Sequence, residues 1–153
     1  MKLKSPKFEE GGIIPSLYTC EGKQVNPPLE ITGVPPGAKS LVLLMEDPDV
    51  PKSLRPDGMF DHWVVFNIPP QTQKIAEHSH SLAVQGRNTK GKDEYFGPCP
   101  PNGEHRYFFK LYALDTLLSL PPGSSKKEVE EAMKGHLLAS CQLMGRYEKG
   151  KGY

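Results

Sequence analysis

Two carboxylates and two imidazoles mark the part of this 153-residue sequence that could carry out chemistry. Asp47 and Asp49, separated by one proline, directly follow the apolar run 41–45. His62 and His105 each stand at the start of a run rich in apolar and aromatic residues. Such groups can exchange protons, ligate a metal ion or recognise an anion by hydrogen bonding. Taken alone, each has a plainer interpretation, since Asp-Pro-Asp is a common turn and a histidine at the start of a strand is often only structural.

The strands that must position these groups are readable from composition. Segments 40–46, 62–68 and 105–114 are dominated by apolar, β-branched and aromatic residues. The acids follow the first segment, whereas each histidine precedes the bulk of its own segment. If the first strand runs antiparallel to the other two, its end lies beside their starts. We therefore expect Asp47, Asp49, His62 and His105 to gather at one rim of a sheet, which favours a pocket over a solvated turn.

A proline-rich segment, GPCPPNGEHRY at 97–107, leads into the third strand. Cys99 keeps its backbone N–H between two prolines that have none, so this amide is available to a ligand. A rigid segment with a free N–H beside two histidines suits an anion such as phosphate. The two carboxylates would repel that anion unless they hold the histidines protonated or accept hydrogen bonds from it. The sequence thus favours a zwitterionic or protonated ligand.

Composition limits the class of protein. The length predicts a single domain, 1–153, and a formal charge of +1 predicts no nucleic-acid partner and no electrostatic membrane association. The longest apolar run is too short to span a bilayer, and the first residues carry no secretory signal, so we expect a cytoplasmic protein without membrane insertion. Three cysteines without metal-finger spacing predict free thiols. Sixteen prolines and fifteen glycines favour an all-β domain of short segments.

The remaining elements are expected as follows. Weaker strands are predicted at 29–31 and 82–85, and the polar ends 1–6 and 148–153 are predicted to fray. Ser125 and Glu128 have the spacing of a capping box, which begins a helix. The helix is predicted to continue until Gly145, because apolar residues recur at helical intervals: Val129, Met133, Leu137, Cys141 and Met144. This apolar stripe is expected to pack on a sheet.

Four stretches together resemble the phosphatidylethanolamine-binding proteins: DPDVP, DHWVVFNIP, GPCPPNGEHRYFFKLYAL and, at the N-terminus, FEEGGIIPSLYTCEGKQVNPPLEITGVPPGAKSLVL. The last resembles the prokaryotic, Raf-kinase-inhibitor-like branch, and the similarity runs from Phe8 to Tyr147. It implies a β-sandwich with a large antiparallel sheet, a smaller second sheet and a helix near the C-terminus. It also implies an anion pocket, with Trp63 and Pro98 nearby, built from Asp47, Asp49, His62, Cys99, His105 and Tyr107.

This sequence departs from the eukaryotic pattern at two points. Eukaryotic members tend to have glycine where Cys99 stands, so the pocket should be narrower here. The eukaryotic C-terminal segment that closes the pocket is not recognisable. A small phosphate-containing or carboxylate ligand is therefore expected instead of a phospholipid. The kinase partners of eukaryotic members are not expected for this protein. The resemblance is compatible with a homodimer.

Three functions follow, in decreasing order of support. The first is a binding protein whose pocket holds a phosphate-like anion and which regulates a partner protein, with no cofactor. The second is an inhibitor of a serine protease or kinase that acts through an exposed loop, 50–60 or 86–97. The third is an Asp/His hydrolase or a metal site. It ranks last because the sequence contains neither GxSxG nor HExxH, so no catalytic residue, metal ligand or enzymatic activity is predicted.

Overall fold

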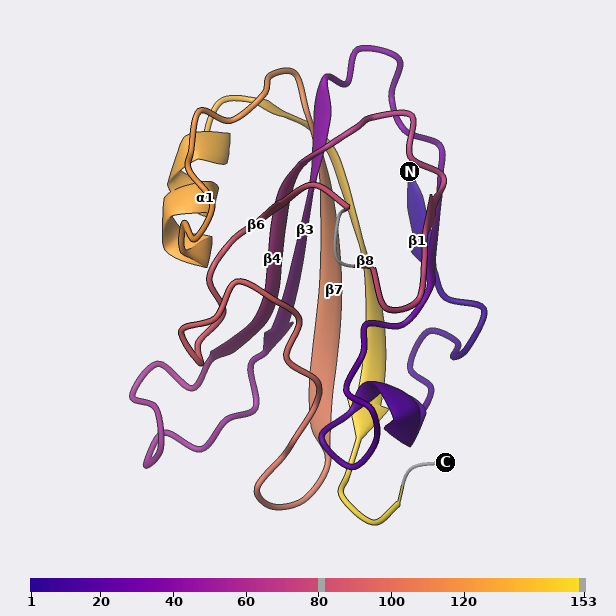
Figure 1. The fold of residues 1–153 in the computed structure, drawn as a ribbon, viewed down its shortest axis with the longest axis vertical. Coiled ribbons are helices and arrows are strands. Elements are labelled where there is room, and N and C mark those ends of the chain that lie inside the picture. Colours follow the sequence, from indigo (N-terminus) through magenta and orange to yellow (C-terminus); the bar gives the residue numbers. More distant parts are fainter. Residues whose placement is uncertain (80–81, 152–153) are drawn as a thin grey trace.

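The computed structural model describes residues 1–79 and 82–151. Within these ranges the strands form two antiparallel sheets (Figure 1). The small sheet has the order β1-β2-β5, and the large sheet has the order β6-β4-β3-β7-β8. The strands are β1 (Lys2–Lys4), β2 (Leu29–Thr32), β3 (Ser40–Asp47), β4 (Phe60–Ile68), β5 (Lys74–Ile75), β6 (Val84–Gln85), β7 (His105–Leu114) and β8 (Leu137–Tyr147). A 3-10 helix, η1 (Ser16–Tyr18), and one α-helix, α1 (Lys126–Met133), complete the elements.

The large sheet is covered on both faces. One face packs against the small sheet in a core that includes Leu3, Ile31, Leu43 and Phe109. The opposite face carries α1, as Figure 1 shows, and buries a second cluster that includes Val64 and Val129. This arrangement confirms the predicted all-β sandwich with its helix near the C-terminus.

The central strand β3 explains why the run before the two aspartates is almost wholly apolar. Every residue of Ser40–Asp47 is buried, because β4 and β7 flank the strand and both faces of the sheet are covered. Strand β3 is antiparallel to both neighbours, as the prediction of a common rim required. The end of β3 therefore lies beside the starts of β4 and β7.

The predicted long helix is wrong beyond its first two turns. The capping box at Ser125 and Glu128 is present, but the helix ends at Met133 and Gly135 follows with a φ of 82°. Residues 137–147 form β8, which pairs with β7 along its whole length. Spacings of four between apolar residues fit a strand as well as a helix, because four is a multiple of the strand period of two. The pairing with β7 satisfies the backbone of β8 and decides between the two.

The N-terminal residues and residues 148–151 are more ordered than predicted, whereas 152–153, for which fraying was also predicted, lie outside the described residues. Residues 2–4 form β1, which pairs with β2, so the expected fraying of 1–6 is wrong. Near the other end, the Gly150 N–H donates to Glu21 Oε1 at 2.9 Å. The weaker predicted strands are present as β2 and, in shortened form, as β6. In the ranges that the structure describes, no helix is both long and apolar enough to cross a membrane.

Candidate functional site

Asp47 and His105 form a buried hydrogen-bonded pair where β3 ends and β7 begins. Asp47 Oδ2 lies 2.6 Å from His105 Nδ1, and both side chains are only 4% exposed. Asp47 Oδ1 accepts the Asp49 backbone N–H at 2.8 Å. Burial raises the pKa of the Asp47 carboxyl, and the hydrogen bonds from His105 and Asp49 oppose that rise. The pair therefore lies at the predicted rim of the sheet, where both side chains are buried.

The Asp49 carboxylate is bonded to Arg106 and not to this pair. It binds Arg106 through the backbone N–H at 2.8 Å, Nε at 3.0 Å and a terminal guanidinium nitrogen at 2.8 Å. The side-chain hydrogen bond with Arg106 is the main reason why the pKa of Asp49 is lowered. The two aspartates of the DPD segment thus have different roles, and Asp49 ties the β3 turn to the start of β7.

His62 is held in one tautomer by the proline-rich segment. Its Nδ1 lies 2.6 Å from the backbone carbonyl oxygen of Phe96, and a carbonyl can only accept, so Nδ1 carries a proton. Burial lowers the pKa of His62 to about 4, and the charge of His105 adds to this effect. The ring is therefore neutral at neutral pH, with Nε2 as an acceptor. Of the two alternatives for the carboxylates, holding the histidines protonated does not apply to His62, and accepting hydrogen bonds from the ligand stays open.

A break in the β3–β4 register turns His62 toward the pocket. Met45 pairs with Trp63, but Glu46 pairs with Asp61, so His62 is an extra residue in β4. Such a bulge re-aims a side chain. Strict alternation would have placed His62 on the same face as Val64 and Phe66, which pack in the cluster that contains α1 residues. The bulge places His62 at the cavity. His62 contacts the Tyr107 ring edge-on, with the ring centroids 5.3 Å apart.

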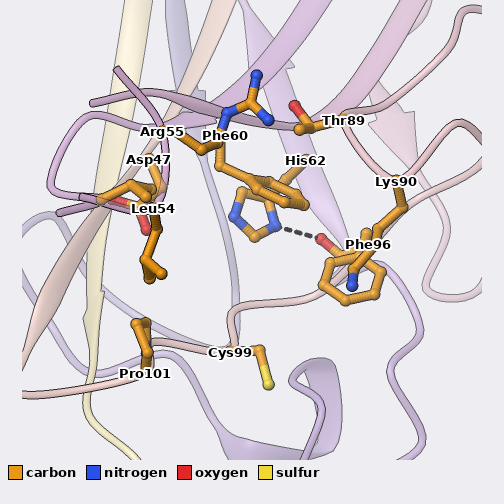
Figure 2. A pocket seen from close by; sticks show the side chains of 11 residues that line it. Asp47, Leu54, Arg55, Phe60, His62, Thr89, Lys90, Phe96, Cys99 and Pro101 are labelled. Carbon is orange, nitrogen blue, oxygen red and sulfur yellow. Dashed lines mark hydrogen bonds between the residues drawn. The ribbon is translucent and has the colours of Figure 1, made fainter. Parts of the chain in front are cut away.

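A cavity of about 420 Å³ opens in front of His62 (Figure 2). Its walls combine the predicted Asp47, His62 and Cys99 with residues of two long loops. The residues that sequence reasoning missed are Val50, Leu54, Arg55, Phe60, Thr89, Lys90, Phe96 and Pro101. Most of them belong to 50–60 and 86–97, the segments singled out for protein inhibition. These loops were found by their composition, but only the fold shows that they line the cavity.

The other predicted site residues support the cavity without lining it. His105 stands behind Asp47, and Tyr107 lies beside His105 with the ring planes 25° apart. Burial raises the pKa of the Tyr107 hydroxyl, and the Cys99 backbone group opposes the rise. Trp63 Nε1 donates to Gln85 Oε1 at 3.1 Å, and the Pro98 carbonyl accepts the Cys20 N–H at 3.1 Å. Among the described residues, no group of three His, Cys, Asp or Glu side chains could hold a metal ion.

Two cationic side chains stand among the loops over the cavity. Lys90 Nζ lies 5.4 Å from the centroid of the Phe96 ring, a cation–π geometry. Arg55 donates from Nε to the Met59 carbonyl at 2.8 Å. Figure 2 shows His62 between Asp47 and Phe96, with Arg55 and Lys90 projecting from the loops around it. The cavity therefore combines acceptors on its inner wall, apolar and aromatic sides, and positive charge.

Cys99 is joined to Cys20 by a disulfide, so the prediction of three free thiols is wrong for these two. Their Cα atoms lie 5.4 Å apart although 79 positions separate them in the chain. The Gly97 N–H also donates to Gln24 Oε1 at 3.1 Å, and the Tyr95 hydroxyl donates to the Tyr18 carbonyl at 2.7 Å. This wall of the cavity is thus tied to the segment around η1. Cys141 is free, as predicted.

Removing the disulfide should lower stability. The double substitution of Cys20 and Cys99 by alanine is expected to reduce the free energy of unfolding by about 2 kcal/mol, because it releases a long loop in the unfolded chain while the neighbouring hydrogen bonds persist. Urea denaturation measures this. Cys141→Ala, which breaks no disulfide, is the control. An unchanged unfolding midpoint in the double variant would show that the hydrogen bonds alone hold the wall.

Comparisons with known proteins identify relatives of this chain. The model of the family "Phosphatidylethanolamine-binding protein" matches residues 4–148. A UPF0098 protein of Chlamydia trachomatis is 50% identical over 149 residues, covering 97% of this chain and 99% of the relative. A UPF0098 protein of Methanothermobacter thermautotrophicus is 49% identical over 156 residues, covering 98% of this chain and 100% of the relative.

Solved structures share the fold. A proposed phosphatidylethanolamine-binding protein homologue from Chlamydia trachomatis superposes with a TM-score of 0.94 at 50% identity, covering 96% of each chain. YbcL of E. coli, described as a new member of the mammalian family, gives a TM-score of 0.85 at 29% identity, covering 96% of this chain and 97% of its own. The chain therefore belongs to the phosphatidylethanolamine-binding protein family.

Proposed function

We propose that this protein binds a small oxyanion, a phosphate-containing or carboxylate compound, in the cavity bounded by Asp47, His62 and Cys99. The observation that carries this proposal is the combination of polar groups on the inner wall with Arg55 and Lys90 from the loops. A volume of about 420 Å³ is at the small end of ligand sites. It accommodates a phosphate or a headgroup-sized molecule.

A cavity wall that is held in place by covalent and hydrogen bonds supports a binding role. The disulfide and the backbone hydrogen bonds around Phe96 and Gly97 hold one wall in place before any ligand arrives. A preformed wall lowers the conformational entropy lost on binding. The family description refers to binding of phosphatidylethanolamine, whose headgroup combines a phosphate with an ammonium group. We extend only this headgroup chemistry to the present chain, and propose that binding of the anion regulates a partner protein.

Calorimetric titration with inorganic phosphate and with phosphoethanolamine tests the proposal. We expect both to bind, and we expect Lys90→Ala to weaken the affinity by roughly threefold, since a solvent-accessible charge contributes up to about 1 kcal/mol. The control is Lys134→Ala, because Lys134 is 71% exposed and its partner is Glu131 on α1, not a residue of the cavity. No binding of either compound at millimolar concentration would contradict the proposal.

One observation favours a second function, inhibition of a protease or kinase through loop 50–60. Leu54 is 63% exposed although it is a large apolar residue, so its side chain is available to a protein partner. An inhibition assay against a panel of serine proteases and kinases tests this. Inhibition that is lost in Leu54→Ser but kept in Lys90→Ala would favour the loop. Inhibition unaffected by Leu54→Ser, or absent throughout, would exclude it.

A further inference from the structure

We propose that the cavity selects oxyanions that still carry a proton, such as hydrogen phosphate and monoprotonated phosphate esters, over fully ionised oxyanions of the same shape, such as sulfate. The retained P–OH group donates a hydrogen bond to Nε2 of His62 or to Asp47, and the ionised oxygens face Lys90 and Arg55. This inference rests on the proposed function, because it specifies which anions the same cavity takes.

His62 is the first acceptor on the inner wall of the cavity. Nδ1 is committed to the Phe96 carbonyl at 2.6 Å, which leaves Nε2 as the unassigned nitrogen of a buried ring. In Figure 2 the second ring nitrogen points away from Phe96, toward the side of the cavity where Asp47 and Leu54 lie. A neutral imidazole with Nδ1 protonated can only accept at Nε2. A ligand that binds at Nε2 of His62 must therefore donate a hydrogen bond to it.

Asp47 is the second acceptor on the inner wall. One of its carboxylate oxygens contacts His105 and the other accepts the Asp49 N–H, but each oxygen has two lone pairs, so the carboxylate keeps capacity to accept. Asp47 also lines the cavity. Two acceptors on the inner wall cannot be satisfied by a ligand whose oxygens are all ionised, and placing such oxygens against them costs desolvation without a compensating hydrogen bond.

The other charged and titratable groups around His62 do not supply the missing proton. From β7, His105 is bonded through Nδ1 to Asp47, and the Tyr107 ring lies edge-on to His62. From the loops, Lys90 lies over Phe96 and Arg55 is bonded to the Met59 carbonyl. Further out, Asp49 and Arg106 pair with each other, and Thr89 adds a neutral hydroxyl. Among the described residues none of these groups is bonded to Nε2 of His62, so this nitrogen is available to accept a hydrogen bond from a donor of the ligand.

Sulfate is the informative comparison because it matches phosphate in shape and has no proton at neutral pH. A site built to accept from a ligand hydroxyl strongly rejects an analogue without one, so we expect phosphate to bind at least about tenfold more tightly than sulfate at pH 6. A phosphate monoester loses its second proton with a pKa of about 6. Its affinity should therefore fall by roughly twentyfold between pH 6.5 and 8, as the protonated fraction falls, while sulfate binding stays weak throughout.

The experiment has a ligand-free arm and a ligand arm. Long-range ¹H–¹⁵N spectra of the free protein at pH 7 should show His62 neutral with the proton on Nδ1. Calorimetry should then show the preference for phosphate over sulfate at pH 6 and its loss in His62→Gln, because the glutamine amide can donate as well as accept. His136→Gln, at an exposed histidine paired with Asp115, is the control and should keep the preference.

The outcomes separate this inference from the proposed function. Equal affinity for phosphate and sulfate, or a His62 ring that is protonated on Nε2 at pH 7, overturns the inference and leaves anion binding intact. A complete absence of binding at every pH, by phosphate, phosphoethanolamine and sulfate alike, overturns the proposed function and this inference with it.

Discussion

Replacing Asp47 by alanine is expected to lower the free energy of unfolding by about 3 kcal/mol, because it leaves buried donors without an acceptor. His105 Nδ1, 2.6 Å from the carboxylate, and the Asp49 N–H, at 2.8 Å, would both lose their partner. Both residues of the pair are buried, so water cannot easily replace the lost bonds. Urea denaturation measures the loss, and an unchanged dependence on urea concentration would show that the fold itself persists.

Asp49→Ala is the matched control. It removes a carboxylate two positions away, but its ion pair with Arg106 is partly exposed to solvent, so a loss below about 1 kcal/mol is expected. Equal losses in the two variants would contradict the assignment of Asp47 to the buried pair. The comparison also separates stability from binding, since only Asp47 lines the cavity.

The second large effect is a loss of stability in mild acid that comes from His62. Its pKa in the folded protein is about 4, against 6.5 for a free histidine. Between these values the unfolded chain binds a proton that the folded chain does not, so the free energy of unfolding falls as the pH falls from 6.5 to about 4. At about 1.4 kcal/mol for each pH unit, this interval corresponds to about 3 kcal/mol.

Denaturation at several pH values between 7 and 4 tests this prediction on the wild type and on His62→Gln. Carboxyl groups titrate in the same range. Their effects on the pH dependence of the free energy of unfolding have opposite signs, since the pKa of Asp47 is raised and that of Asp49 is lowered. The difference between the two proteins isolates His62. A difference that does not change with pH would mean that His62 is not buried in the neutral state.

Much of the fold could be predicted because local pattern and tertiary context agree in the central strands. Strand β3 is buried on both faces, and its sequence is apolar without alternation, so its position was readable. Strand β8 was not readable, because its apolar spacing suits a helix equally well and only its pairing with β7 decides. The turn at Gly135 separates the two elements, but a glycine inside an apolar pattern does not by itself end a helix.

The positions of the site residues could be predicted where strand topology alone determines them. The convergence of Asp47, His62 and His105 follows from antiparallel pairing of three strands, and the family resemblance added Cys99 and Tyr107. The orientation of His62 was not predictable, because it depends on a bulge that no residue type signals. The Cys20–Cys99 disulfide depends on two cysteines 79 positions apart, and the contributions of Arg55 and Lys90 depend on how two loops fold over the sheet.

The most direct test of the account is a crystal structure of the protein grown at pH 6 in the presence of phosphate and without sulfate. The account predicts one tetrahedral anion in the cavity, within hydrogen-bond distance of His62 Nε2 or Asp47, with other oxygens toward Lys90 or Arg55. An empty cavity at saturating phosphate, or phosphate bound only elsewhere on the surface, would contradict the assignment of this cavity as the binding site.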